Sequence, residues 1–233
     1  MKKLNKLLLA VVMMVTAFGA WGQEFSIGDL TYKVIDTSSK FVEVSNVTSS
    51  GKTKSTIEIP GRVTYSGTDY RVYRVAGLAF QNLTSLTTLK IRLGVDILFA
   101  DAFKGCTNLA TVYLPSSIAG IRSNTFNGCS KLKTVYYNGF NFPNLGVSFP
   151  SNSGMTLYIS NASKRSPSEY KSQSGWNVFS NVYYSDECYD EYMRDGGLYS
   201  VGYYDNDGPT TVRKATLVGY KTSGGDTDRK SVV

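Results

Sequence analysis

Apolar residues recur every 23 positions through the middle of the chain, and the rest of the sequence is arranged around this repeat. Phe80, Phe103 and Phe126 keep the spacing. Four more columns of residues keep it as well: Leu83, Cys106 and Cys129; Leu86, Leu109 and Leu132; Leu89, Val112 and Val135; and Ile91, Leu114 and Tyr137. A repeat of this length is typical of a solenoid, in which each unit buries its apolar face only against its neighbours.

Each repeat divides into a strand and a turn. Segments 86–91, 109–114 and 132–137 end in alternating apolar and polar residues, which indicates strands with one buried face. The residues around each phenylalanine predict a helical or 3₁₀ turn, which Gly105 and Gly128 end with a positive φ. Stacked side by side, the strands predict a parallel sheet with two outward columns: Thr88, Thr111 and Thr134, and Lys90, Tyr113 and Tyr136.

The segment before the repeats predicts a β-hairpin. Residues 25–34 and residues 40–45 each alternate between apolar and polar types, and the polar residues 36–39 between them suit a loop. We therefore expect one strand on each side of that loop.

A divergent rung and a second hairpin follow. Residues 56–60 predict the first rung of the solenoid, because Ile57 and Ile59 match Val112 and Leu114 of a later repeat. Nine additional residues then precede Phe80, at positions 64–72 with a turn at 66–69. They predict a hairpin that caps the open end of the solenoid rather than a functional site, since terminal units of such arrays need a cap.

The array closes near residue 160. Leu157 follows Val135 by 22 residues, so residues 156–159 predict the last rung, and Tyr158 extends the tyrosine column. Two interpretations stay open for residues 185–233. They are either the start of a second N-terminal module in a truncated gene model or a divergent β-rich tail packed on the last rung.

The repeats resemble a known family. Residues 101–109 (DAFKGCTNL) and 125–132 (TFNGCSKL) are similar to BspA-like leucine-rich repeats, the treponemal surface-antigen type, and residues 112–118 (VYLPSSI) match their strand-and-proline segment. The closing unit is similar at Tyr170 and Trp176, and residues 21–24 (WGQE) look Bacteroidetes-like. The resemblance covers residues 25–184 and implies a secreted or surface-displayed binding protein, with adhesion to host or microbial ligands the usual assignment.

The expected fold is mainly β with short helical or 3₁₀ turns. It is a leucine-rich-repeat solenoid of 23-residue repeats with a β-hairpin N-terminal cap. The expected divisions are a signal peptide, a cap with the first divergent rung, the solenoid with its closing unit, and the tail or truncated module: residues 1–22, 23–74, 75–184 and 185–233.

Residues 1–22 have the pattern of a signal peptide. A basic end precedes an apolar run at residues 7–15, and Ala20 and Gly22 suit cleavage before Gln23. The run is too short for a helix that stays in the bilayer, and no later segment is apolar for long enough to span one, so we expect an exported, soluble protein. Cleavage leaves 22 basic and 18 acidic residues, which lowers the net charge from +7 to +4. These charges are scattered, which argues against nucleic-acid binding.

The residue types restrict the chemistry. The chain contains no histidine, which removes Ser-His-Asp and Cys-His catalysis and the commonest metal ligand. Cys106 and Cys129 predict a buried column of small side chains rather than a disulfide, because equivalent side chains on successive rungs point the same way. Cys188 predicts a lone thiol, in a poorly packed tail.

Acidic residues near the C-terminus do not predict a catalytic or metal site. The pairs Asp186/Glu187 and Asp190/Glu191 suit a solvated loop better than the acid and base of a glycosidase. Residues 205–208 (DNDG) suit a turn better than a calcium loop. We therefore expect no cofactor and no enzymatic activity.

The candidate ligand-binding face follows the tyrosine column and comprises Lys90, Arg92, Tyr113, Tyr136 and Tyr158. Tyrosine offers a large, stiff contact area with a hydroxyl group, although cross-strand aromatic neighbours also simply stabilise sheets. The sequence thus predicts a non-enzymatic protein that recognises an extracellular protein ligand of host or microbial origin. The alternative is a carbohydrate-binding accessory protein whose exposed tyrosines stack on sugar rings.

Overall fold

The structure is a computed structural model that describes residues 22–139, 142–146, 148–152, 154–160, 163–185 and 188, and the backbone of four more strands between residues 190 and 228. The predicted signal peptide therefore lies outside the described residues, except for Gly22. Asp186, Glu187 and the acidic turn at residues 205–208 also lie outside them.

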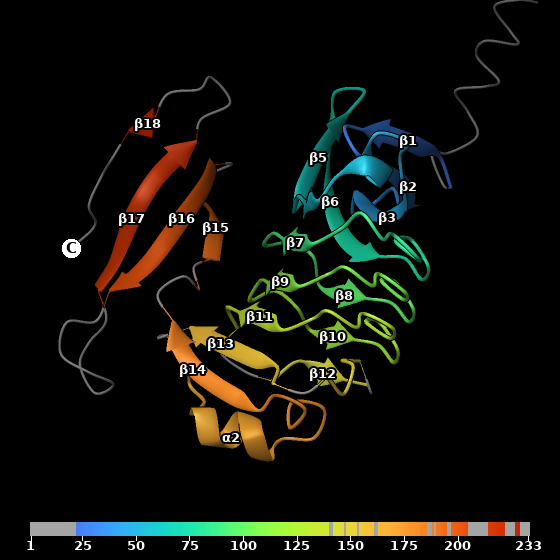
Figure 1. Ribbon diagram of the computed structural model, residues 1–233. Coiled ribbons are helices and arrows are strands. Elements are labelled where there is room, and N and C mark those ends of the chain that lie inside the picture. Colours follow the sequence, from blue (N-terminus) through green and yellow to red (C-terminus); the bar gives the residue numbers. More distant parts are fainter. Residues whose placement is uncertain are drawn as a thin grey trace, which may run out of the picture.

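A parallel sheet of six strands forms one wall of a solenoid (Figure 1). Equivalent residues of successive repeats are direct neighbours, so Thr134 pairs with Thr111 on one side and with Thr156 on the other. This confirms the predicted solenoid and its sheet. In spatial order the strands are β14 (Asn181–Ser185), β13 (Thr156–Ser160), β11 (Thr134–Tyr137), β9 (Thr111–Leu114), β7 (Thr88–Ile91) and β4 (Thr56–Ile59).

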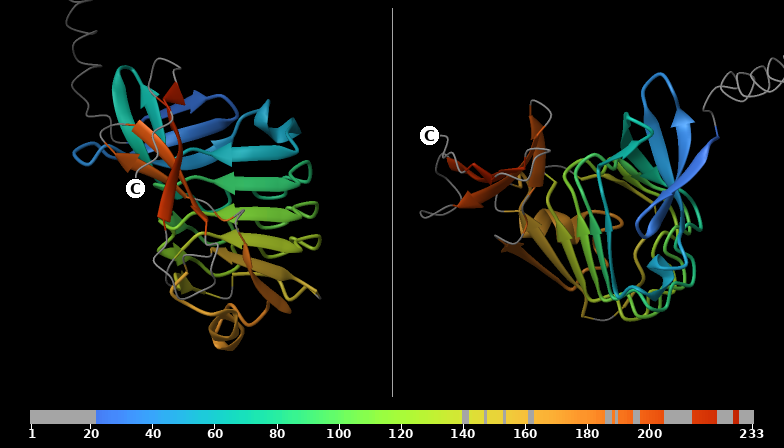
Figure 2. Two further views of the ribbon diagram at one scale, coloured as in Figure 1. Left: turned by 90° about the vertical axis from the view of Figure 1, so that its left-hand side faces the viewer. Right: turned by 90° about the horizontal axis from the view of Figure 1, so that it is seen from above.

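A second sheet of eight strands forms another wall, and the repeats coil around the core between the walls (Figure 2). In the repeats its strands are only two residues long, and they pair in parallel. The strands in spatial order are β1 (Glu24–Ile27), β2 (Leu30–Asp36), β3 (Phe41–Val47), β6 (Thr68–Val75), β8 (Ile97–Leu98), β10 (Gly120–Ile121) and β12 (Asn144–Leu145), while β5 (Arg62–Tyr65) pairs with β6 alone.

The N-terminal cap differs from the sequence expectation in one strand. The single strand predicted over residues 25–34 is wrong, because a turn at residues 28–29 divides it into the antiparallel strands β1 and β2. Gly28 supplies the positive φ of 59° that this tight turn requires. A two-residue turn leaves the alternation of apolar and polar residues intact, so the pattern did not reveal it.

The second hairpin is present as predicted. β5 and β6 are antiparallel, and Ser66 and Gly67 between them have φ values of 48° and 74°. Tyr65 of β5 stacks on Phe25 of β1 with ring centroids 4.0 Å apart, which ties the two hairpins together. A 3₁₀ turn, η1 (Gly51–Thr53), precedes the first rung.

Stacked phenylalanines form the centre of the core. Ring centroids are 4.8 Å apart for Phe80 and Phe103, 5.3 Å for Phe103 and Phe126, and 5.3 Å for Phe126 and Phe149. All four rings are buried, and Trp176 covers the last one with a centroid distance of 5.9 Å. The predicted core is confirmed and gains Phe149, which keeps the 23-residue spacing.

The segments between the strands are single turns with two positions of positive φ. Hydrogen bonds of 3₁₀ type close them, such as the 3.2 Å bond from the amide of Cys106 to the carbonyl of Phe103. The positive φ predicted for Gly105 and Gly128 is confirmed, at 75° and 77°. A second column with positive φ was not predicted: Leu78, Asp101 and Asn124, at 65°, 60° and 61°.

The solenoid has one rung more than the sequence analysis expected. The prediction that residues 156–159 form the last rung is wrong, since β14 pairs in parallel with β13. A helix, α2 (Pro167–Ser172), replaces the usual turn between these strands, so Val182 follows Leu157 by 25 residues and breaks the period. Ser166 caps α2 reciprocally with Glu169, and Tyr170 of the helix is buried against the core.

The remaining strands form an antiparallel sheet of their own. They are β15 (Asp190–Arg194), β16 (Gly197–Tyr204), β17 (Lys214–Lys221) and β18 (Thr227–Asp228). Both interpretations of residues 185–233 predict strands here, and strands are present.

Candidate functional site

Tyrosine side chains form a continuous row on the outward side of the six-stranded sheet. The strand register places Tyr136 between Tyr113 and Tyr158. The rings of Tyr113 and Tyr136 are 4.5 Å apart and 3° from parallel, and those of Tyr136 and Tyr158 are 4.9 Å apart and 15° from parallel. The predicted tyrosine column is therefore formed.

The tyrosine column ends at a lysine on its N-terminal side and at a further tyrosine on its C-terminal side. On the N-terminal side the ammonium group of Lys90 lies 5.6 Å from the ring centroid of Tyr113, a cation–π distance. On the C-terminal side β14 adds Tyr183, whose ring is 6.1 Å from Tyr158 and tilted by 39°. The sequence analysis missed Tyr183 because the 23-residue period breaks before β14.

Stacking hides most of the ring faces. Tyr113, Tyr136 and Tyr158 are half-buried, so the expectation that they form an exposed column is wrong for these three. Only Tyr183 is more exposed, at 53%. Because each inner ring has neighbours on both faces, the column offers ring edges and hydroxyl groups to a ligand rather than flat aromatic surfaces.

The two predicted basic residues both have neighbours in the face. Arg92 forms an ion pair with Glu58 of β4, with a distance of 2.9 Å between nitrogen and oxygen. Lys90 lies beside Tyr113, as described above. Both cationic groups are thus held against the sheet. The carboxylate of Glu58 balances the charge of Arg92, while Lys90 contacts the ring of Tyr113.

The predicted column of small core side chains is present as free, buried thiols. The Cys106 thiol donates to the carbonyl of Phe80 at 3.0 Å, and the Cys129 thiol to the carbonyl of Phe103 at 3.2 Å. The neighbouring Cys106 side chain, and then burial, raise the pKa of Cys129 well above its usual range, whereas the Cys129 side chain lowers the pKa of Cys106. Cys188 is also buried, and its thiol donates to the carbonyl of Tyr158 at 3.4 Å, so its predicted place in a poorly packed tail is wrong.

A second group of aromatic and charged residues lies on the eight-stranded sheet. Phe41 and Tyr73 stack with centroids 4.9 Å apart, and the Arg71 guanidinium lies 5.6 and 5.7 Å from the two rings. Arg71 also pairs with Asp96, whose pKa is raised because burial outweighs the attraction of the guanidinium. Sequence reasoning missed this group, since its residues do not share the 23-residue period.

Among the described residues, no group of three or more cysteine, aspartate or glutamate side chains could hold a metal ion. No helix in this part of the chain is long and apolar enough to cross a membrane.

The repeats match a protein family in six copies. The model of the BspA type leucine-rich repeat region matches residues 55–159. These repeats are BspA-type leucine-rich repeats. Their five candidate residues, Lys90, Arg92, Tyr113, Tyr136 and Tyr158, all lie inside the matched region, whereas Tyr183 lies beyond it.

One solved structure shows the same fold, and others are similar with lower scores. A leucine-rich repeat protein from Bacteroides capillosus is 20% identical with a TM-score of 0.52, over 58% of this chain and 97% of that chain. The T. pallidum leucine-rich repeat protein is 18% identical with a TM-score of 0.48, over 70% and 86%. One from Bacteroides ovatus is 23% identical with a TM-score of 0.45, over 70% and 42%. No curated protein matches the sequence.

Proposed function

We propose that this chain is a non-enzymatic recognition protein, exported or held at the cell surface, that binds a protein ligand of host or microbial origin. The observation that carries the proposal is the tyrosine column on the outward face of the BspA-type repeats. Tyrosine is enriched in recognition surfaces because it combines a stiff apolar ring with a hydroxyl group. The predicted signal peptide supports the location.

The geometry of the column favours a protein ligand over a carbohydrate. A sugar ring stacks on an aromatic face, and the inner tyrosines turn their faces toward each other. A row of hydroxyl groups and ring edges instead suits the polar backbone and side chains of a protein surface. The carbohydrate alternative keeps one support, the exposed ring of Tyr183 at the end of the column.

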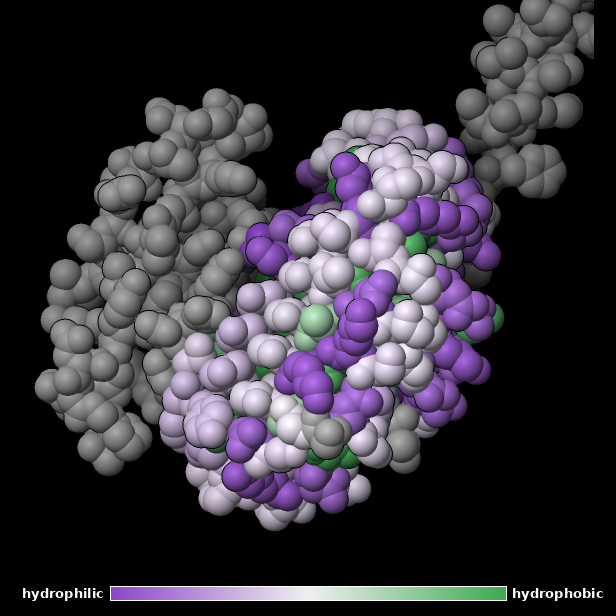
Figure 3. Space-filling model, in the orientation of Figure 1, coloured by the Kyte–Doolittle hydropathy of each residue, from purple (hydrophilic) through white to green (hydrophobic). Residues whose placement is uncertain are grey.

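The face of the molecule seen in Figure 3 has no large hydrophobic patch among its described residues. In the view of Figure 3, hydrophobic residues show only as small, separated areas among polar ones. Affinity should therefore come from a few central tyrosines and not from a large apolar patch.

Binding of a panel of extracellular-matrix proteins and of a glycan array tests the proposal. The double variant Tyr113→Ser/Tyr136→Ser should lose capture of a protein that the unchanged chain binds. Tyr73→Ser is the matched control, because Tyr73 is a stacked aromatic on the other sheet. It should leave capture unchanged.

Two results would contradict the proposal. Capture that survives the double variant in a correctly folded protein removes the column from the binding site. Hits confined to the glycan array would favour the carbohydrate alternative, with Tyr183→Ser as the variant that should then abolish them.

A further inference from the structure

The six-stranded sheet has two edges at which no described strand pairs. β4 forms one edge and β14 forms the other. The carbonyl groups of Ser55, which directly precedes β4, and of Ile59, its last residue, accept hydrogen bonds from the β7 side. Because alternate residues of a strand point to opposite neighbours, the backbone N–H and C=O of Thr56 face the open side. Such an edge is a template for another strand.

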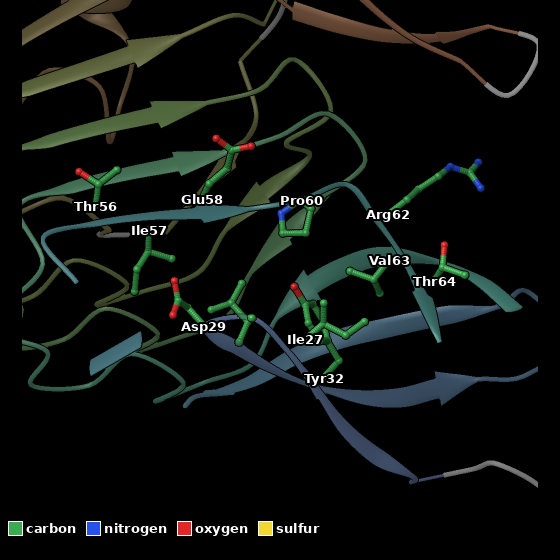
Figure 4. A pocket seen from close by; sticks show the side chains of 12 residues that line it. Ile27, Asp29, Tyr32, Thr56, Ile57, Glu58, Pro60, Arg62, Val63 and Thr64 are labelled. Atoms are coloured by element: carbon green, nitrogen blue, oxygen red, sulfur yellow. The ribbon is translucent and has the colours of Figure 1, made fainter. Parts of the chain in front are cut away.

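An open pocket of about 550 Å³ lies beside β4, between this strand and the cap (Figure 4). It exists because the eight-stranded sheet continues past β6 with β3, β2 and β1, whereas the six-stranded sheet stops at β4. Among the described strands, none lies next to β4 on this side. Apolar and polar residues both line the pocket: Ile27, Ile57 and Val63, and Asp29, Glu58 and Arg62.

The opposite edge carries two exposed tyrosines. Tyr184 pairs in register with Ile159, so it lies on the core side of the sheet, but β14 is the last described strand of the sheet and the ring is 43% exposed. Tyr183 is 53% exposed, and Ile27 in the pocket is 38% exposed. Three of the four large hydrophobic residues exposed in the described part of the chain thus lie either on β14 or in the pocket beside β4. The fourth, Leu78, lies in a turn.

We propose that β14 of a second copy of this chain occupies the pocket, so that copies associate head to tail. The sheet would then continue from β14 of one copy into β4 of the next, with the same strand direction as within the solenoid. Continuation of the columns places Tyr184 on the side of the sheet that holds Ile57 and Ile59, which is the side of the pocket.

The pocket has the chemistry that a tyrosine requires. Ile27 and Val63 provide apolar contact for the ring, while Asp29 and Arg62 provide partners for the hydroxyl group at the rim. The two copies use different surfaces, so the contact is heterologous and leaves a free end on each side. Association should therefore increase with concentration and extend beyond dimers.

Sedimentation velocity of the purified full chain over a wide concentration range tests this inference. The unchanged chain should shift to larger species as its concentration rises. Tyr184→Lys removes one side of the joint and Ile27→Lys removes the other, so each variant alone should stay monomeric. Mixed together they retain one complete joint, and the mixture should form dimers and nothing larger.

Leu78→Lys is the matched control, because it places the same charge at an exposed apolar residue that belongs neither to β14 nor to the pocket. It should associate like the unchanged chain, and circular dichroism should show that all variants keep the fold. A chain that stays monomeric at its highest concentration, or a mixture of variants that does not dimerise, would overturn the proposal. Ligand capture through Tyr113 and Tyr136 is a separate readout, so either proposal can fail without the other.

Discussion

Leu78 takes a backbone conformation for which leucine is poorly suited. Its φ of 65° lies in the left-handed region, where the equivalent residues of the next repeats are Asp101 and Asn124. Asparagine tolerates this region, whereas other side chains pay roughly 1 kcal/mol or more. The exposed leucine has no compensating burial, at 53% exposure.

Leu78→Asn should therefore raise the free energy of unfolding by about 0.5–1 kcal/mol, measured by urea denaturation. Leu78→Ala is the control, because it removes the exposed apolar side chain but retains the unfavourable backbone. Equal stability of the two variants would show that the gain does not come from the left-handed conformation.

The thiols of Cys106 and Cys129 should not react in the folded protein. Both side chains are fully buried, so a reagent in solution cannot reach either sulfur while the repeats stay folded. Mass spectrometry after treatment with iodoacetamide should find both residues unmodified in native conditions and modified in urea. Labelling of either residue before unfolding would mean that the repeats open locally.

At the scale of elements, the phenylalanine ladder couples each repeat to the next. Phe103 contacts rings on both sides, at 4.8 and 5.3 Å. Phe103→Ala should lower the free energy of unfolding by about 3–5 kcal/mol, because it leaves a cavity that the neighbouring rungs cannot close. Phe103→Leu should cost less, and so should Phe41→Ala on the half-buried outer face. A cost for Phe103→Ala no larger than that for Phe41→Ala would contradict the ladder's structural role.

The 23-residue period predicted the strands whose own alternation of apolar and polar residues agrees with their pairing to the next repeat. β7, β9 and β11, their inward residues and the phenylalanine turns follow from it directly. β8 and β10 do not, since two residues are too few to show an alternation. β14 was missed because α2 interrupts the spacing, and the β1–β2 turn was missed because it preserves the alternation.

The candidate site, like the fold, was predicted in part. The outward positions of Tyr113, Tyr136 and Tyr158 follow from strand alternation and register. The covering of their faces does not, because ring orientation depends on contacts between residues that are 22 or 23 positions apart in the sequence. This difference matters for function, since it weakens the carbohydrate alternative.

At the scale of the whole molecule, the absence of histidine predicts stability that is insensitive to pH near neutrality. The free energy of unfolding should stay nearly constant from about pH 5.5 to about pH 9. In acid, hydrogen bonds from Ser38 and Ser39 lower the pKa of Asp36 to about 2. Stability from Asp36 is thus complete above about pH 4 and lost as the pH falls toward 2. Urea denaturation at a series of pH values measures this; a steep change between about pH 6 and pH 7 would contradict it.

Buried tyrosines should set the alkaline limit of the fold. Burial raises the pKa of Tyr32, and it raises the pKa of Tyr170 to about 12. Since the phenol ionises near about pH 10 in the unfolded chain, the folded state retains protons that the unfolded state has lost. The stability that this linkage confers is complete below about pH 10 and is lost as the pH rises toward about 12.

Tyr170→Phe tests this origin of the alkaline limit, because it keeps the ring that packs 5.2 Å from Trp176 and removes only the ionisable hydroxyl group. Its unfolding transition in alkali, followed by circular dichroism, should move to higher pH. Tyr183→Phe changes an exposed tyrosine in the same way and should leave the transition where it is. If both variants behave alike, ionisation of the buried phenols is not what unfolds the solenoid, and repulsion among the net charges of the whole chain becomes the better explanation.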